Sequence, residues 1–157
     1  MFELFKRKKK NDIFSPLDGK CIDISEVKDK TFADKLLGDG VAIIPSSVAV
    51  SAPIDGEIEM IFPTKHAFGI KRDDGLEILI HIGINTVELD GKGFVALKNV
   101  NDKVKAGEQI IIFDKSYLKN KDMTTMIILT SSLGDYKKIK VGENVKCKEV
   151  IMQNETS

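Results

Sequence analysis

The sequence has few of the residues that usually mark a metal site or a disulfide framework. Its 157 residues include two cysteines and two histidines, and neither Cys21 nor Cys147 belongs to a C-x-x-C or other ligand-spaced cluster. Closely spaced Cys and His ligands are typical of zinc sites, and disulfides are typical of oxidising compartments. We therefore expect no metal and no cofactor. The cysteines are expected to be reduced thiols in a cytoplasmic protein, or to form at most one disulfide if they lie close together.

Long apolar runs and an excess of charge are also missing. No stretch approaches the roughly 20 apolar residues that cross a bilayer, and the charged start of the chain lacks the apolar segment of a secretory signal. The 24 Lys and Arg residues balance 24 Asp and Glu residues. Five of these cations lie at residues 6–10, so the rest of the chain is acidic. That distribution argues against a nucleic-acid-binding protein.

Residues 1–12 are predicted to be a basic amphipathic tail. Four apolar side chains within residues 1–5 precede the five cations. One interpretation is a solvated tail. The other is a short interfacial helix that attaches the protein weakly to anionic lipid at the inner face of the plasma membrane, where each cation contributes about 1 kcal/mol.

Short apolar runs separated by Gly, Pro and Asp continue from Ile13 onward, a pattern typical of an all-β domain. Helical signal is sparse: a helix capped by Thr31 and ending at Gly38, and single turns within 116–122 and 132–138. The folded domain is expected to span residues 13–151, with a C-terminal tail at 152–157. The predicted strands are residues 20–24, 41–44, 48–50, 57–62, 67–71, 76–82, 94–97, 109–113, 125–130 and 145–151.

Two internal similarities indicate a duplicated architecture. Residues 15–22 resemble residues 52–58, each with a Pro and an Asp-Gly pair before an apolar stretch. Residues 104–110 resemble residues 139–145, each with a Gly-Glu pair between apolar positions. Pro and Gly at these positions suit tight turns that lead into strands. Chance similarity between turn sequences is the other explanation.

The two histidines form the candidate site. His81 lies in the apolar run of residues 76–87, and a neutral imidazole, with a pKa of about 6.5, offers an unprotonated nitrogen near pH 7. The ordinary explanation is a buried core histidine bonded to a backbone carbonyl. His66, however, follows Thr64 by two residues, which places both side chains on one face of a strand. Two imidazoles and a hydroxyl that converge would form a reactive site.

Several ordered stretches together resemble the glucose-type enzyme IIA domain of the bacterial phosphoenolpyruvate-dependent sugar phosphotransferase system. The resemblance covers roughly residues 13–151. It implies an all-β fold, an antiparallel β-sandwich of duplicated hybrid motif type with short helical turns. The matching stretches are residues 15–19, 37–43, 52–56, 64–68, 80–89, 91–94 and 104–107.

The resemblance also implies roles for the candidate residues. His81 would accept a phosphoryl group on Nε2 from the phosphohistidine carrier protein HPr and pass it to a cysteine on the IIB domain of a sugar permease. His66 would stabilise the phosphoryl oxygens, and Thr64 would orient His66. Imidazole chemistry agrees, because it is uncharged at pH 7 and forms a labile bond to phosphorus. A donor imidazole beside the nucleophile would stabilise the transferring group.

Transfer between two proteins requires a surface that excludes water at the contact. Candidates for its apolar rim are Phe62, Ile80, Ile82 and Val87. Asp39 is a candidate acidic contact. Asn85 departs from the family pattern, which usually has Asp there; the amide keeps hydrogen bonding but loses the charge that would pair with arginines on a partner.

Other functions remain open at this stage. A biotinyl or lipoyl carrier would show similar turns but requires a lysine between methionines, and the chain has no Met-Lys-Met. A zinc peptidase on a related duplicated fold would require three ligands and usually a His-x-His pair, which is missing. A regulatory binding protein would use the same histidine as a signal of sugar availability, and it differs only in the partner that binds.

Overall fold

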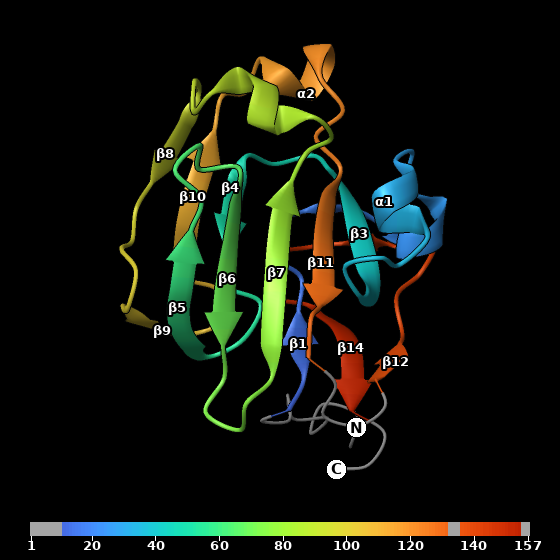
Figure 1. The fold of residues 1–157 in the computed structure, drawn as a ribbon. Helices are drawn as coiled ribbons and strands as arrows, with labels where there is room; N and C mark the ends of the chain where they lie inside the picture. The colour runs from blue at the N-terminus through green and yellow to red at the C-terminus, as the bar shows by residue number, and fades with distance from the viewer. Residues whose placement is uncertain (1–10, 132–135, 155–157) are drawn as a thin grey trace.

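The computed structural model describes residues 11–131 and 136–154, and β-strands dominate this part of the chain (Figure 1). The helices are short: η2 (Ile24–Glu26), α1 (Lys30–Ala33), η3 (Thr86–Leu89) and α2 (Tyr117–Asn120). The strands are β1 (Ile13–Phe14), β2 (Gly19–Asp23), β3 (Asp39–Pro45), β4 (Ala49–Ser51), β5 (Gly56–Ile61), β6 (Ala67–Lys71), β7 (Glu77–Ile82), β8 (Phe94–Ala96), β9 (Lys103–Val104), β10 (Gln109–Phe113), β11 (Thr125–Leu129), β12 (Tyr136–Lys138), β13 (Asn144–Val145) and β14 (Val150–Asn154).

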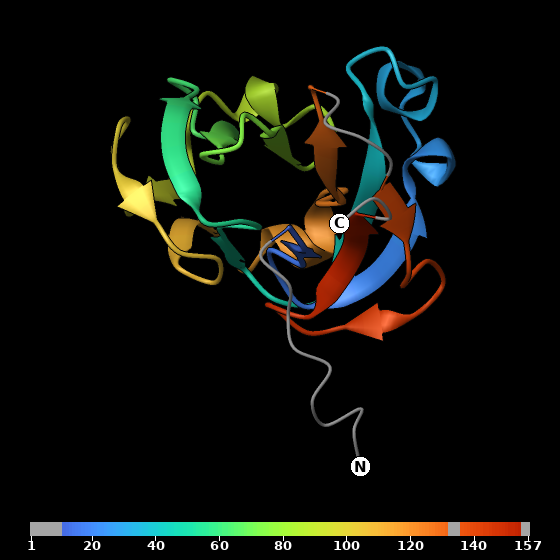
Figure 2. The same ribbon diagram turned by 90° about the horizontal axis from the view of Figure 1, so that it is seen from below.

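The strands form three antiparallel sheets. The largest has the order β13-β2-β3-β11-β7-β6-β5-β9, and the two smaller sheets have the orders β1-β14-β12 and β4-β10-β8. Seen from below, the strands are arranged around a common interior (Figure 2). The predicted all-β antiparallel sandwich with short helical turns is therefore confirmed.

The large sheet has an apolar cluster on each face. Alternate residues of β7 enter the main core, and its three isoleucines, Ile78, Ile80 and Ile82, are buried there. A second, smaller cluster lies on the opposite face, where Ile22, Ala42 and Met126 pack under η2 and α1. Because side chains of a strand alternate between faces, the residues between the isoleucines face this outer side. Leu79 and His81 lie there.

The duplication is visible in two hydrogen bonds between an aspartate side chain and the backbone. In one copy the carboxylate of Asp18 accepts a bond from the Cys147 backbone N–H at 2.7 Å; in the other, the carboxylate of Asp55 accepts from the Ala106 N–H at 2.8 Å. The next residue in each copy is a glycine whose added Cβ would lie within 2.5 Å of a facing carbonyl oxygen, so a side chain is excluded at both. The Asp-Gly pairs noted in the sequence therefore mark equivalent corners.

One half of the predicted repeat has the wrong register. The sequence similarity pairs residues 104–110 with 139–145, whereas the structure makes residues 103–108 equivalent to 144–149. Val104 pairs with Gly56 in β5 as Val145 pairs with Gly19 in β2. Strand pairing, not the resemblance of two Val-Gly-Glu-type turns, determines the equivalence.

Three predicted elements also differ. The helix begins two residues earlier than expected: Asp29, rather than Thr31, accepts the capping bond, and the helix ends at Ala33 instead of reaching Gly38. A positive φ of 61° at Lys35 ends the helical conformation. Residues 136–138 form strand β12 instead of a turn, and 132–135 lie outside the described residues.

The predicted final strand, residues 145–151, is divided into β13 and β14. A turn separates them, in which the Glu149 N–H donates to the Lys146 carbonyl at 3.0 Å and Lys148 has a φ of 75°. The folded part also extends past the predicted limit of residue 151. Met152 is 1% exposed and pairs with Ile13, so β14 carries core residues of the domain.

Candidate functional site

His81 lies near the end of β7, on the outer face of the large sheet. Its neighbours across the two adjacent strands are Ala67 in β6 and Met126 in β11. The next residues in the same row are Ala42 in β3 and Ile22 in β2. Small and apolar neighbours leave the imidazole partly buried but reachable from outside the sheet.

A backbone carbonyl selects the tautomer of His81. Nδ1 lies 3.0 Å from the carbonyl oxygen of Gly83. Because a carbonyl only accepts hydrogen bonds, Nδ1 carries the proton and Nε2 keeps its lone pair. Gly83 has a φ of 81°, and a Cβ there would lie 2.4 Å from the Thr86 side chain. This turn therefore requires glycine, and its carbonyl is directed back to the histidine.

His66 approaches the same point from the turn before β6. Its side chain is 3% exposed, and its ring centroid lies 4.9 Å from that of His81 at an interplanar angle of 78°. Nδ1 of His66 lies 2.5 Å from the hydroxyl oxygen of Thr64. When that hydroxyl donates, the proton of the neutral ring is on Nε2. Thr64 and His66 lie in a turn with Lys65 at a φ of 60°, and not on one strand as predicted, yet their side chains meet.

Both imidazoles are held in the neutral form. Burial lowers the pKa of His81 to about 4, and the neighbouring His66 adds to this effect, while the Gly83 hydrogen bond and the charge of Asp29 oppose it. Burial also lowers the pKa of His66. A neutral imidazole keeps the nitrogen lone pair that a nucleophile requires. At pH 7 the site therefore combines one available lone pair with a second imidazole beside it.

Two aromatic rings border the histidines. Phe32 of α1 lies 4.8 Å from His81 between ring centroids, and Phe62 lies 5.3 Å from His66. Phe62 was a predicted rim residue, whereas Phe32 and the nearby Asp29 were missed. The helix signal at residues 31–38 was visible in the sequence, but nothing in it showed that this helix lies over the strand that carries His81.

The predicted rim residues fall into two groups. Val87, in η3, is 53% exposed, and Asn85 is exposed at the start of the same helix with a left-handed φ of 58°, a conformation that Asn tolerates better than most residues. Ile80 and Ile82 are 0% exposed and belong to the core, so their assignment to a partner-facing rim is wrong. Their strand positions alternate with His81, and the residues of β7 that share its face are Glu77 and the apolar Leu79.

Asp39 is bound within the chain. Its carboxylate accepts a hydrogen bond from Lys138 Nζ at 2.7 Å and lies 3.5 Å from Lys35 Nζ. The acid whose charge acts on His81 is Asp29. Contact between Asp39 and a partner stays a prediction, and it would require competition with Lys138.

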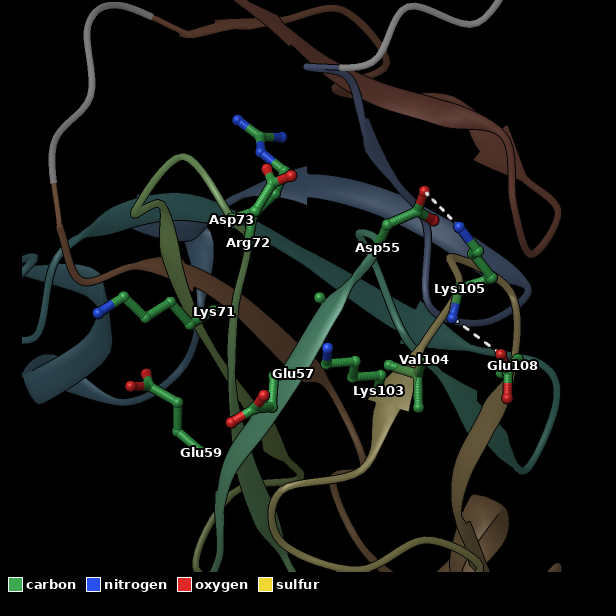
Figure 3. A pocket seen from close by; sticks show the side chains of 11 residues that line it. Asp55, Glu57, Glu59, Lys71, Arg72, Asp73, Lys103, Val104, Lys105 and Glu108 are labelled. Atoms are coloured by element: carbon green, nitrogen blue, oxygen red, sulfur yellow. Dashed lines mark hydrogen bonds and ion pairs between the residues drawn. The ribbon is translucent and has the colours of Figure 1, made fainter.

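An open pocket of about 980 Å³ lies away from the histidines, along β5, β6 and β9 (Figure 3). Its charges alternate across strands: Lys103 pairs with Glu57, which pairs with Lys71, which pairs with Glu77. Opposite charges on adjacent strands satisfy one another. Neither histidine lines this pocket, so the candidate site is separate from it.

Residues 11–131 and 136–154 contain neither a candidate metal centre nor a candidate membrane-spanning helix. No group of three or more His, Cys, Asp or Glu side chains in these ranges could hold a metal ion. In the same ranges, no helix is both long and apolar enough to span a bilayer.

Comparison with known proteins connects this geometry to a family. The model of the family described as phosphoenolpyruvate-dependent sugar phosphotransferase system, EIIA 1, matches residues 11–134. The glucose permease IIA of Mycoplasma capricolum has the same fold, with a TM-score of 0.85 and 39% identity, covering 92% of this chain and 96% of that one.

Curated relatives agree. The glucose-specific EIIA component of Buchnera aphidicola is 44% identical over 140 residues, covering 88% of this chain and 87% of the relative. That of Staphylococcus epidermidis is 43% identical over 136 residues, covering 83% and 82%. The glucoside-specific EIICBA component of Staphylococcus carnosus is 47% identical over 122 residues, which is 76% of this chain but 18% of that relative. The resemblance noted in the sequence is confirmed: the chain belongs to the EIIA family of the phosphoenolpyruvate-dependent sugar phosphotransferase system.

Proposed function

We propose that the chain carries a phosphoryl group on Nε2 of His81, taken from HPr and passed to a cysteine of the IIB domain of a sugar permease. In the first step the N–P bond of phospho-HPr breaks as the Nε2–P bond of His81 forms. In the second step this bond breaks and an S–P bond forms on the IIB cysteine. Neither step consumes a further reactant.

One observation carries the proposal: the Gly83 carbonyl holds the proton of His81 on Nδ1, which leaves the Nε2 lone pair available. The depressed pKa keeps that lone pair unprotonated at neutral pH. A nucleophile that is already deprotonated requires no general base in the first step.

His66 is proposed to stabilise the group in transit. Phosphoryl transfer depends mainly on positioning and on stabilising charge on the three equatorial oxygens. With Thr64 donating to Nδ1, the Nε2–H of His66 donates to those oxygens. The two rings are 4.9 Å apart between centroids, which leaves this donor beside the transferring group.

The exposed surroundings support transfer between two proteins. Phe62 packs against His66, and the exposed Val87 lies in η3, which follows the strand of His81. Such apolar groups exclude water when a partner docks. The relatives named EIICBA combine the A component with C and B components in one chain, which supports a IIB domain as the second partner.

The test is direct. The protein is incubated with enzyme I, HPr and phosphoenolpyruvate, and mass spectrometry of the intact protein is expected to show the gain of one phosphoryl group that acid removes. His81→Ala is expected to abolish the gain, while His66→Gln, which keeps the nucleophile, is the matched control. Full labelling of the His81→Ala variant would falsify the proposal.

We further propose a location for this reaction, the cytoplasm, with weak attachment to anionic membranes through residues 1–10. This segment lies outside the described residues, and the proposal is supported by its five cations and its apolar side chains. Co-sedimentation with anionic vesicles is expected for the full chain at low salt and not for a variant that lacks residues 1–10. Equal sedimentation of the two proteins would contradict it.

A further inference from the structure

The chain between β2 and β3 leaves the sheet in an excursion that covers His81. Residues 24–38 leave the sheet after Asp23, form η2 and α1, and return at Asp39. This excursion carries Phe32, whose ring contacts His81, and Asp29, whose charge acts on it. The position of the excursion therefore affects both the packing and the electrostatics of the nucleophile.

One lysine binds both ends of the excursion. Nζ of Lys138 lies 2.6 Å from Oδ1 of Asp23 and 2.7 Å from Oδ1 of Asp39. Lys138 belongs to β12, 115 residues after Asp23 and 99 after Asp39. In both views β12 and α1 lie on the same side of the molecule (Figure 1, Figure 2). The side chain of Lys138 is 20% exposed, so solvent screens these contacts less than it would at an open surface.

The two carboxylates also organise the backbone where the excursion starts and ends. The second oxygen of Asp23, Oδ2, accepts bonds from the Ser25 N–H and hydroxyl and so caps η2. Oδ1 of Asp39 accepts from the Gly40 N–H at the start of β3. The lysine therefore connects two carboxylates that each have a structural role of their own.

The ammonium of Lys138 offsets the repulsion between the carboxylates of Asp23 and Asp39. Two carboxylates bound to the same nitrogen are close enough to repel each other. Burial alone would raise the pKa of Asp23, but the hydrogen bonds from Lys138 and Ser25 outweigh it and lower the pKa to about 2. For Lys138, the bonds to Asp23 and Asp39 outweigh burial and raise its pKa. All three groups are thus charged at neutral pH.

We propose that Lys138 is a positioning residue for phosphoryl transfer: by binding Asp23 and Asp39 together, it holds the excursion so that Phe32 and Asp29 stay against His81. The link to transfer rests on the proposed function of His81. The geometric part of the proposal concerns the unphosphorylated protein and is tested without any transfer reaction.

Loss of the ammonium shifts the excursion without unfolding it. The outer apolar cluster, which includes Ile24, Val27 and Phe32, still holds the segment to the sheet. Repulsion between Asp23 and Asp39, only partly offset by Lys35, then moves its two ends apart. Phe32 covers His81 less well, and water reaches the imidazole.

The test compares four proteins: the wild type, Lys138→Met, Lys138→Arg and Lys137→Met. Methionine keeps the length of the side chain but removes the charge, and arginine restores a cation that reaches both carboxylates. Lys137 is exposed on the same strand, and the described residues offer it no ion pair, so Lys137→Met is the matched control. Thermal unfolding verifies that each variant is folded.

The first measurement is NMR titration of the His81 imidazole, together with cross-relaxation between the rings of Phe32 and His81. In Lys138→Met the pKa of His81 is expected to rise by about one unit, with weaker cross-relaxation; Lys138→Arg and Lys137→Met are expected to match the wild type. A lower melting temperature in Lys138→Met with an unchanged His81 titration would show a merely structural role and overturn the proposal. So would an equal pKa change in Lys137→Met.

The second measurement is transfer from phospho-HPr. Lys138→Met is expected to raise KM several-fold with a smaller change in kcat, because the displaced excursion lies beside His81, where the partner must dock, while the nucleophile itself remains. An unchanged KM would contradict the positioning role. If wild-type His81 accepts no phosphoryl group at all, the proposed function fails, whereas the titration still decides whether Lys138 positions Phe32.

Discussion

The imidazoles of His66 and His81 stand nearly perpendicular, with centroids 4.9 Å apart, and each has its Nδ1 bound by the chain. Thr64 binds the first and the Gly83 carbonyl binds the second. Both rings therefore present Nε2 as the atom left for chemistry. A hydroxyl can donate, which places the proton of His66 on Nε2, whereas a carbonyl only accepts, which leaves a lone pair on Nε2 of His81.

His66→Gln is expected to keep much of the ability to accept a phosphoryl group and to lose onward transfer. The amide can still donate to the phosphoryl oxygens, but it cannot adapt to the charge that develops as the N–P bond breaks. Rapid-quench measurement of each half-reaction, with phospho-HPr and with an isolated IIB domain, checks this. Equal losses in both half-reactions would argue against separate roles for the two histidines.

Thr64→Val is expected to slow transfer less than substitution of either histidine. The change removes one hydrogen bond to Nδ1 of His66 while keeping the shape of the side chain, at a cost of about 1 kcal/mol, or roughly fivefold in rate. Steady-state phosphotransfer measures it. Thr64→Ser keeps the hydroxyl and is the control; a Ser variant as slow as the Val variant would show that the methyl group, and not the bond, matters.

Asn85→Asp is expected to speed encounter with an arginine-bearing partner. The added carboxylate lies at an exposed position, and Asp also tolerates the left-handed backbone found there, so the fold is expected to accept it. The gain is expected to decline as salt rises from low to physiological concentration. Slower transfer at low salt would indicate instead that the partners of this chain match the amide.

Ile80→Ala is expected to reduce mainly the stability of the protein, and Leu79→Ala is expected to weaken mainly the docking of a partner. Ile80 is buried in the core, so its truncation is expected to cost about 2–5 kcal/mol of unfolding free energy. Leu79 lies on the outer face beside His81, where truncation is expected to cost less stability and to raise KM for a protein partner. Urea unfolding and transfer kinetics separate the two, and a stability loss from Leu79→Ala as large as that from Ile80→Ala would contradict this assignment of faces.

Acidification is expected to destabilise the protein between about pH 6.5 and pH 4. The pKa of His81 is about 4 in the folded chain, below its ordinary value near 6.5, so the unfolded chain binds a proton that the folded chain does not. This contribution to stability is therefore fully present above pH 6.5 and is lost as pH decreases toward 4, and it amounts to on the order of 3 kcal/mol. Urea titrations at pH 7 and pH 5 test this, and His81→Gln is expected to reduce the difference between them.

The amino-acid sequence was sufficient to predict the all-β fold class and to single out His66 and His81 as a pair. Alternating short apolar runs, Asp-Gly corners and a histidine in an apolar strand are local features, and each has a local physical cause: the two-residue period of a strand, the close approach of backbone at a glycine, and the chemistry of imidazole. The comparisons confirm the family that these stretches resembled.

Tertiary structure decided which residues face the site. Ile80 and Ile82 border His81 in the sequence but point into the core, since adjacent strand residues lie on opposite faces. Phe32 and Asp29 lie about fifty residues before His81 in the chain, and β12, with Lys138, lies further still on the other side. The pairing of β2, β3, β11 and β7 into one sheet brings Phe32 and Asp29 to His81, and Lys138, from the separate sheet of β1, β14 and β12, reaches Asp23 and Asp39. Strand order and register depend on long-range packing that no local pattern encodes.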